Sequence, residues 1–267
     1  TFKTITATAG LNEGIVAGSS TYFCGHSYEY KGHTYYCTGS HGNISVVQAL
    51  QYSCNIYFYQ LSEALTIDNL TKYAELYGLG SPTGIETGDA AGRFANPETY
   101  AEYGWEWTVG HVLQAAIGQS ETAVTPLQMA VVASTIANKG VYQQPLSFSR
   151  IVDSNGNVVV DMHQQQDRHQ VFKPSTAYLV VDMLKEAVQS GTGTKAKISS
   201  QVVAGKTGTN SDSKGVFFAG MTGWYSGSVW IGHDNYKALS SKATGGNAAA
   251  PLWQSFMEKI HKAKNLD

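Results

Sequence analysis

The sequence is poor in charged residues and in proline. Asp, Glu, Lys and Arg make up 14% of its 267 residues, against about 25% in an average soluble domain. The formal net charge of −2 gives no electrostatic reason to expect a nucleic acid or an acidic membrane surface as partner. Only 6 prolines accompany 28 glycines, which favours tight turns over disordered linkers. Nucleic-acid binding is therefore the first function class that the composition argues against.

Long apolar runs, signal peptides and repeats are also missing. No apolar run reaches about 18 residues, so no membrane-spanning segment is expected, and nothing matches a secretory signal peptide. The apolar fraction of 42% is sufficient for a core. Because no repeat or charge block divides the chain, we expect one domain over residues 1–267.

Helical patterns dominate the first part of the chain. The first helix is expected to stop at Gly10 or Gly14, and residues 18–43 are expected to form an irregular insertion. Residues 44–65 predict a helix that is interrupted at residues 53–55. Later helices are expected over 66–80, 125–140 and 173–193, with N-caps at Thr66 or Asp68, at Thr125 and at Ser175.

Strand patterns dominate the second part. A hairpin turning at Asn155-Gly156 precedes three strand-like segments separated by Gly and Ser turns. The last helix is expected to bury Trp253, Phe256, Met257 and Ile260. The expected segments are 149–162 for the hairpin, 201–208, 215–225 and 226–234 for the strands, and 250–264 for the helix. This order predicts an α+β fold, an antiparallel β-sheet flanked by helices.

The most specific short motif is GKTGTN at residues 205–210. Lys206 follows an apolar strand, and Gly208 lets a ligand approach the backbone. An edge strand of this kind can pair with an extended peptide while the lysine attracts an anion and a threonine hydrogen-bonds it. A strand that ends in a solvated Gly turn is the alternative. The spacing of a phosphate-binding loop is absent.

A second motif, Ser53-Cys54-Asn55, interrupts an otherwise apolar helical stretch. Serine and asparagine disfavour a helix interior, so these residues indicate either a functional site or a locally capped helix junction.

Together the two motifs resemble the signature of penicillin-binding proteins and serine β-lactamases, which is Ser-x-x-Lys, Ser-x-Asn and Lys-Thr-Gly. Six segments resemble transpeptidase domains in the family's order: HGNISVVQALQYSCNIYFYQL, GSPTGIE, AIGQSETAVTPLQMAVVASTIANKG, GTGT, AGKTGT and GGNAAAPLWQSFME. The chain is most similar to the class B, monofunctional, elongation-type members, which act in peptidoglycan synthesis and cell shape. The separation of Ser53 from Lys206 exceeds that of typical class A β-lactamases, and no deacylating glutamate loop matches.

The first residues, Thr1-Phe2-Lys3, correspond to the end of the family's Ser-Thr-Phe-Lys motif. The nucleophilic serine is therefore expected directly before Thr1, and the chain as numbered is expected to be inactive. A helix start without a cap is the alternative.

The resemblance implies the roles of the remaining groups. Lys3 would act as the base, with its pKa lowered by neighbouring cations such as Lys206. Ser53 would relay a proton, and Asn55 would hold the substrate amide and Lys3. Lys206, Thr207 and Thr209 would bind the substrate carboxylate, Gly208 would leave room for it, and the Thr209 N–H would contribute to the oxyanion hole. The implied reaction is acyl transfer on peptides ending in D-Ala-D-Ala, and β-lactams would acylate the same serine. It needs no cofactor.

All three cysteines lie near the N-terminus, where Cys24, Cys37, His41 and Cys54 form a C-x12-C-x3-H-x12-C array. A hairpin of residues 28–30 against 33–36 would bring two of the sulfurs together. A Cys3His zinc site and a Cys24–Cys37 disulfide are both compatible with this pattern. Some elongation-type relatives bind zinc through a histidine and the middle cysteine of Ser-Cys-Asn, although carboxylates stand there at the other two positions.

The resemblance also implies where and with whom the protein would act. Peptidoglycan stem peptides lie on the extracytoplasmic face of the bacterial cell membrane, so an upstream anchor and a glycan-polymerising membrane partner are expected. A β-lactam-sensing or inactive homologue and a serine β-lactamase are the alternative functions.

Overall fold

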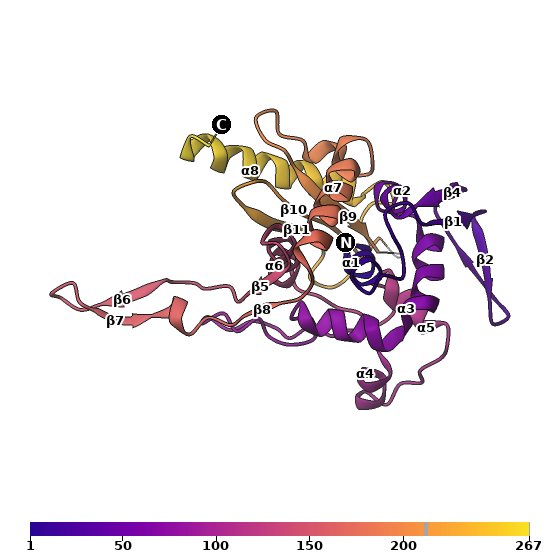
Figure 1. Ribbon diagram of the computed structural model, residues 1–267, viewed down its shortest axis with the longest axis horizontal. Helices are drawn as coiled ribbons and strands as arrows, with labels where there is room; N and C mark the ends of the chain where they lie inside the picture. The colour runs from indigo at the N-terminus through magenta and orange to yellow at the C-terminus, as the bar shows by residue number, and fades with distance from the viewer. Residues whose placement is uncertain (211–212, 267) are drawn as a thin grey trace.

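The computed structural model describes residues 1–210 and 213–266, arranged as in Figure 1. The α-helices are α1 Lys3–Asn12, α2 Val46–Gln51, α3 Asn55–Leu76, α4 Pro97–Glu102, α5 His111–Ala116, α6 Pro126–Ala137, α7 Pro174–Gln189 and α8 Ala250–Lys264. The strands are β1 Thr21–Cys24, β2 Ser27–Tyr30, β3 His33–Tyr36, β4 Gly42–Ser45, β5 Val141–Gln143, β6 Arg150–Val152, β7 Val158–Asp161, β8 Arg168–Gln170, β9 Ala204–Thr209, β10 Gly215–Met221 and β11 Ser226–Gly232. Short helical turns are η1 Met162–Gln164, η2 Thr194–Ala196 and η3 Gly245–Ala249. Among the described residues, none of these helices combines the length and apolarity needed to cross a membrane.

The main sheet has three antiparallel strands in the order β11-β10-β9. The pairing runs from Gly215↔Gly232 to Met221↔Ser226 on one side of β10, and from Val216↔Thr209 to Met221↔Ala204 on the other. All three strands were expected from the sequence, as was the position of β9 at the edge. The prediction of an α+β fold is confirmed.

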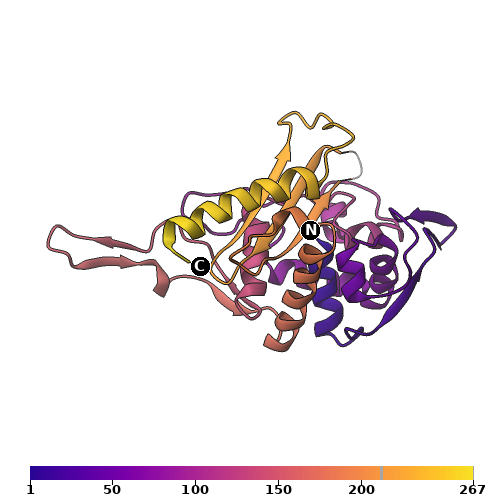
Figure 2. The ribbon, with the colours of Figure 1, turned by 90° about the horizontal axis from the view of Figure 1, so that it is seen from above.

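Alternate residues of β10 face two different cores, as the period of a strand requires. Val216 and Phe218 pack with Trp253 of α8. Ala219 and Met221 point to the other face, into the core that includes α6 and α1. Figure 2 shows α8 running across the sheet. The sheet is thus covered by helices on both faces, and this arrangement holds β9 against the N-terminal part of the chain.

The N-terminal region adds two small antiparallel sheets, one pairing β1 with β4 and the other β2 with β3. The expected turn at Lys31-Gly32 joins β2 and β3, and both residues have positive φ. The interpretation of residues 18–43 as irregular is therefore wrong, because most of this segment pairs in short strands. A second expected hairpin, β6–β7, extends away from the body of the molecule (Figure 1).

Three local predictions need correction. Gly10 does not end α1, since it lies inside the helix, where a Cβ would approach Leu61 Cδ1 to 2.9 Å. Ser175 is not the N-cap of α7, because Pro174 already occupies its first turn and Lys173 precedes it as N-cap. Phe256 is 59% exposed on α8, whereas Trp253 and Met257 are buried as expected.

Other helix boundaries agree with the sequence. Thr125 caps α6 in a capping box with Gln128. Ser53-Cys54-Asn55 separates α2 from α3. α3 is interrupted at Thr66, whose φ of 68° and ψ of 161° are not helical, so two helical segments meet there across a kink near the expected helix start at residue 66. Gly78 follows the end of α3 with positive φ, the conformation typical of a C-terminal glycine.

Candidate active site and metal-binding cluster

Lys3 lies in the first turn of α1 and is buried, with 8% of its surface exposed. Its Nζ donates hydrogen bonds to the Ser53 carbonyl at 2.7 Å, to Ser53 Oγ at 3.1 Å and to Asn55 Oδ1 at 2.6 Å. The structure therefore brings together three residues that the sequence singled out from two motifs about fifty positions apart.

The turn that carries Ser53 is held in a strained conformation. Ser53 has φ 58°, the left-handed region that costs a residue with a side chain about 1 kcal/mol or more. Two restraints oppose this cost. The Cys54 N–H donates to the Ala49 carbonyl at 2.9 Å, and Lys3 binds the Ser53 carbonyl. Asn55 is fixed in turn by its Nδ2 donor, which reaches the Tyr36 carbonyl at 3.2 Å.

The second wall of the site is the edge strand β9. Lys206 is buried and donates to the Thr207 carbonyl at 3.2 Å. The same carbonyl accepts a hydrogen bond from the Thr1 amino group at 3.2 Å. A Cβ on Gly208 would lie 3.0 Å from the Thr1 nitrogen, so glycine is what permits this approach. The start of α1 thus lies directly against the Lys-Thr-Gly strand.

The pKa values of Lys3 and Lys206 are both lowered, but for Lys3 the main cause is not the neighbouring cation expected from the sequence. Burial is the main influence on Lys3 and lowers its pKa to about 8, while the sulfurs of Cys37 and Cys54 oppose the shift. Burial also holds the pKa of Lys206 well below its ordinary value, with the charge of Lys3 as the second cause. Desolvation, rather than the neighbouring cation, is therefore the main cause of the lowered pKa of Lys3.

Thr192 was not singled out from the sequence as a site residue. Its Oγ1 lies 2.6 Å from Thr207 Oγ1, and its backbone N–H donates to the Gln51 carbonyl at 3.2 Å. The loop after α7 therefore ties β9 to the end of α2, two residues before Ser53. The segment GTGT had a family resemblance but no assigned role, and it is the signal that could have identified this residue.

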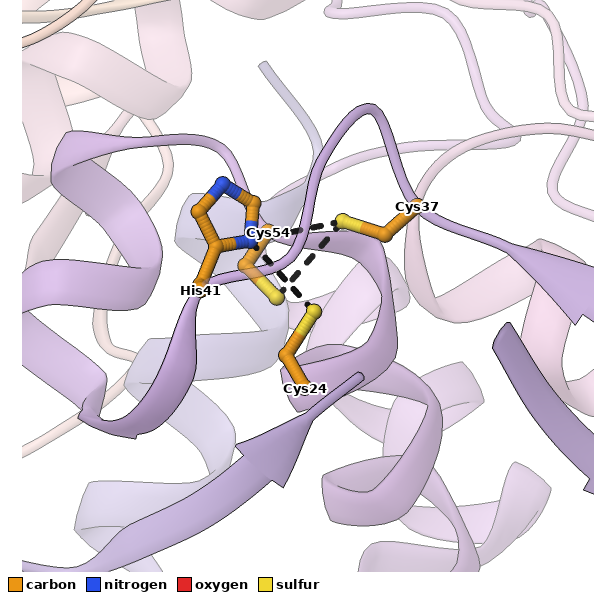
Figure 3. Close-up of side chains that lie close together, drawn as sticks. All are labelled: Cys24, Cys37, His41 and Cys54. Atoms are coloured by element: carbon orange, nitrogen blue, oxygen red, sulfur yellow. Dashed lines mark hydrogen bonds between the residues drawn. The ribbon is translucent and has the colours of Figure 1, made fainter. Parts of the chain in front are cut away.

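The cysteines and His41 gather in one cluster, as Figure 3 shows, and Cys54 directly follows Ser53 in the chain. The four ligand atoms all lie within 4.8 Å of one another. Cys37 Sγ is 3.7 Å from Cys54 Sγ and 3.6 Å from His41 Nδ1, and Cys24 Sγ is 3.4 Å from His41 Nδ1. Tetrahedral zinc with its usual bond lengths places its ligands roughly 3.5–3.8 Å apart. The donor set and its spacing fit such an ion.

Backbone donors surround the sulfurs of this cluster. Asn55 N–H donates to Cys37 Sγ at 3.2 Å, and Tyr57 N–H donates to Cys54 Sγ at 3.4 Å. Cys54 is the N-cap of α3, so its sulfur lies at the N-terminal end of a helix and accepts the hydrogen bond from Tyr57. A hydrogen bond joins the sulfurs of Cys37 and Cys54 at 3.7 Å, and this contact lowers the pKa of Cys37 and raises that of Cys54. All three cysteines are free thiols.

Comparison with known proteins agrees with the motifs. The family model "Penicillin binding protein transpeptidase domain" matches residues 1–258. The chain belongs to this family. The penicillin-binding protein 1A of Clostridium perfringens strain 13 is 30% identical over 224 residues, which are 83% of this chain and 30% of the relative. The protein of the same name from Aquifex aeolicus is 34% identical over 145 residues, which are 54% of the chain and 19% of the relative.

Solved structures of penicillin-binding proteins share the fold of this chain. Apo penicillin-binding protein 3 of Mycobacterium tuberculosis matches with a TM-score of 0.81 and 25% identity, over 99% of this chain and 62% of that one. The D,D-transpeptidase domain of a peptidoglycan glycosyltransferase from Eggerthella lenta matches with a TM-score of 0.79 and 24% identity, over 100% and 65%. The chain spans less than a third of the length of the curated relatives above.

Proposed function

We propose that this chain is the D,D-transpeptidase domain of a cell-wall cross-linking enzyme and a target of β-lactams. The observation that carries the proposal is the convergence of Lys3, Ser53 and Asn55 on one side and of Lys206 on β9 on the other, around the start of α1. Penicillin-binding protein 3 of Mycobacterium tuberculosis, which shares the fold, has been solved in complex with aztreonam and with ampicillin, and this supports a β-lactam-reactive site in the family.

In the proposed reaction the nucleophile is a serine joined directly to Thr1, one helical turn before Lys3. Neutral Lys3 takes the proton of this serine as its oxygen attacks the carbonyl of the penultimate D-Ala. Backbone N–H groups of Thr209 and of the serine stabilise the oxyanion. Ser53, bound to Lys3, passes a proton to the amine of the departing D-Ala. An amine of a second stem peptide then attacks the acyl-enzyme and regenerates the serine.

Substrate binding in this proposal uses the free edge of β9. An extended peptide can pair with an edge strand through backbone hydrogen bonds. Lys206, Thr207 and Thr209 would bind the terminal carboxylate, and a carboxylate beside Lys206 would raise the pKa of that lysine again. Gly208 leaves space at the strand, and Asn55 would hold the substrate amide.

Fluorescent penicillin tests this assignment. A chain that carries a serine directly before Thr1, called the Ser-extended chain below, is expected to be labelled covalently. The chain as numbered and a Ser-extended Lys3→Ala variant are expected to remain unlabelled. Labelling of the chain as numbered would contradict the assignment of the nucleophile. Rapid turnover of a chromogenic cephalosporin would indicate a β-lactamase, and stable labelling without peptide cross-linking would indicate a sensor.

The wider context is part of the same proposal. The sequence resemblance favours a class B, elongation-type parent that is anchored at the extracytoplasmic face of the membrane and works with a glycan-polymerising partner. We expect that the parent protein alone does not polymerise glycan strands and that polymerisation begins when a membrane partner is added. Polymerisation by the parent alone would contradict the monofunctional subclass.

We further propose that Cys24, Cys37, His41 and Cys54 hold a structural zinc ion. The ligand spacing supports zinc, because the distances of 3.4, 3.6 and 3.7 Å between ligand atoms are close to those of a tetrahedral site. Cys24 and Cys37 are also free in the structure rather than bonded to each other. The ion would deprotonate the thiols and fix four chain segments, and no reaction step depends on it. Metal analysis is expected to find one zinc per chain. Absence of metal together with one free thiol would indicate the Cys24–Cys37 disulfide instead.

A further inference from the structure

The connection between α4 and α5 carries an aromatic cluster that the proposed reaction does not use. Its centre is Tyr100, which is buried. Trp105 and Trp107 meet the Tyr100 ring edge-on, with centroids 5.6 and 5.0 Å away, and His111 lies 4.8 Å away. These ring contacts fix the positions of the aromatic side chains within the fold.

The outer part of the cluster presents aromatic rings to solvent. Tyr103 stacks on Trp105 with centroids 4.5 Å apart and an interplanar angle of 16°, and the two residues are 54% and 37% exposed. The guanidinium of Arg93 lies 5.7 and 5.6 Å from their ring centres. Arg93 is itself held by Glu121, through the carbonyl at 2.8 Å and the carboxylate at 3.4 Å. The stacked rings are therefore ordered before any ligand arrives, which lowers the entropy cost of binding.

The two ends of α5, the helix that follows this connection, contact the elements that carry the proposed catalytic groups. A Cβ on Gly110 would overlap the hydroxyl of Tyr35, the neighbour of Tyr36, whose carbonyl binds Asn55. At the other end, a Cβ on Gly118 would overlap the Cβ of Phe2, the neighbour of Lys3. Helix α5, which follows the cluster in the chain, thus packs at both of its ends against neighbours of the lysine–asparagine pair.

We propose that the Tyr103–Trp105 pair, called the aromatic platform below, binds a sugar ring of the glycan strand that bears the stem peptide. The proposal rests on the proposed function, which supplies a substrate attached to sugars. One face of a pyranose ring presents C–H groups with partial positive charge, and these match the negative face of an aromatic ring. Glu102 and Glu106 are exposed beside the platform and offer acceptors for sugar hydroxyls. The Arg93 charge beside the rings is paired with Glu121, and the carboxylates of Glu102 and Glu106 repel an anionic ligand, which disfavours a peptide carboxylate or an acidic lipid here.

The test uses a tetramer of β-1,4-linked N-acetylglucosamine as the probe and the chain itself as the protein. Saturation-transfer NMR is expected to show contact at the ring C–H groups, and intrinsic tryptophan fluorescence is expected to give a binding curve. Tyr103→Ala should weaken binding about fivefold, whereas Tyr103→Phe should keep it within about twofold, since the ring is retained. Tyr178→Ala, at a 74% exposed tyrosine on α7, is the matched control and should bind as the unaltered chain does.

Several outcomes would contradict the proposal that the aromatic platform binds a sugar. They are no sugar binding by the folded chain, equal binding by Tyr103→Ala, and displacement of the sugar by a sugar-free peptide ending in D-Ala-D-Ala, which would assign the platform to the peptide. Thermal unfolding of each variant identifies a folding defect. If Tyr103→Ala does not fold, Tyr103→Phe still tests whether sugar binding depends on the ring rather than on the hydroxyl. Penicillin labelling of the Ser-extended chain is read separately, so a failure of the transpeptidase assignment remains distinguishable from a failure of sugar binding.

Discussion

At the scale of single residues, Lys3 illustrates how burial creates a base. The side chain sits in the core-facing turn of α1, where its ammonium form loses hydration, and its hydrogen bonds go to the Ser53 turn and Asn55. Burial lowers the pKa of Lys3 to about 8, and the nearby cysteine sulfurs keep it from falling further. A lysine in this state is still partly protonated at neutral pH, so its capacity as a base depends on pH in the physiological range.

The first prediction follows from this pKa. Because the neutral amine is the active form in the proposed reaction, the acylation rate of the Ser-extended chain is expected to rise about tenfold from pH 7 to pH 9 and then to level off. The free energy of unfolding should also rise with pH, between about 8 and 10.5. The pKa of Lys3 in the folded protein lies below that of an unfolded lysine, so the unfolded state holds more protons in this range. Stopped-flow acylation by penicillin measures the first effect. A rate that is flat or falls over this range would exclude Lys3 as the base.

Thr192 is a second residue whose role depends on contacts between distant segments. It joins Thr207 of β9 to Gln51 before the Ser53 turn, and the neighbouring Gln51 Nε2 binds Ser190 Oγ at 2.7 Å. The position of the substrate-binding strand relative to the Ser53 turn therefore depends partly on one hydroxyl.

Thr192→Val removes that hydroxyl while it keeps the shape of the side chain. We expect the acylation rate of the Ser-extended chain to fall about fivefold and the free energy of unfolding to fall by about 1 kcal/mol. Thr194→Val, at an exposed threonine in the next turn, is the control and should change neither quantity. Equal effects of both substitutions would show that the Thr192–Thr207 hydrogen bond does not position β9.

At the scale of elements, much of the fold is predictable because its signals are local. The capping box of α6, the three sheet strands and the hairpin at Asn155-Gly156 all follow from neighbouring residues. The features that could not be predicted arise from tertiary contact. The Ser53 turn is strained because Lys3 holds it, and Gly10 stays helical because α3 packs on it through Leu61. The motif residues were identifiable from the sequence, whereas their contacts with Thr192 and Tyr36 required the structure.

The packing of α1 against the end of α5 gives an element-scale prediction at Gly118. This glycine has φ 72°, and a Cβ there would overlap Phe2. Gly118→Ala is therefore expected to lower the free energy of unfolding by more than about 2 kcal/mol, as the sum of backbone strain and steric overlap.

Gly156→Ala separates the two contributions. Gly156 has φ 84° at the tip of the β6–β7 hairpin, with open space around it. This variant carries the strain without the overlap and should cost about 1 kcal/mol. Denaturant unfolding measures both variants, and equal losses would mean that Phe2 moves aside at no cost.

At the scale of the whole molecule, the candidate active site lies where two differently built parts meet. β9 comes from the sheet, whereas the Ser53 turn is supported by the short strands and loops of the N-terminal region. The proposed zinc ligands are drawn from the end of β1, the residue after β3, the loop before β4 and the N-cap of α3. Cys54 lies between Ser53 and Asn55 in sequence, so an ion held there would connect these strands directly to the catalytic turn.

Metal removal should therefore affect both stability and chemistry. Dialysis of the Ser-extended chain against a zinc chelator is expected to lower the midpoint of thermal unfolding by about 5–10 °C, since ligands that the ion holds together would separate. The acylation rate should fall about tenfold, because the Ser53 turn loses its support. Added zinc should restore both values, and a reductant without chelator should leave both unchanged. A protein that the reductant destabilises and the chelator does not would have the Cys24–Cys37 disulfide in this place. Both chemistries use the sulfurs of Cys24 and Cys37, but a reductant breaks only the disulfide and a chelator removes only the zinc.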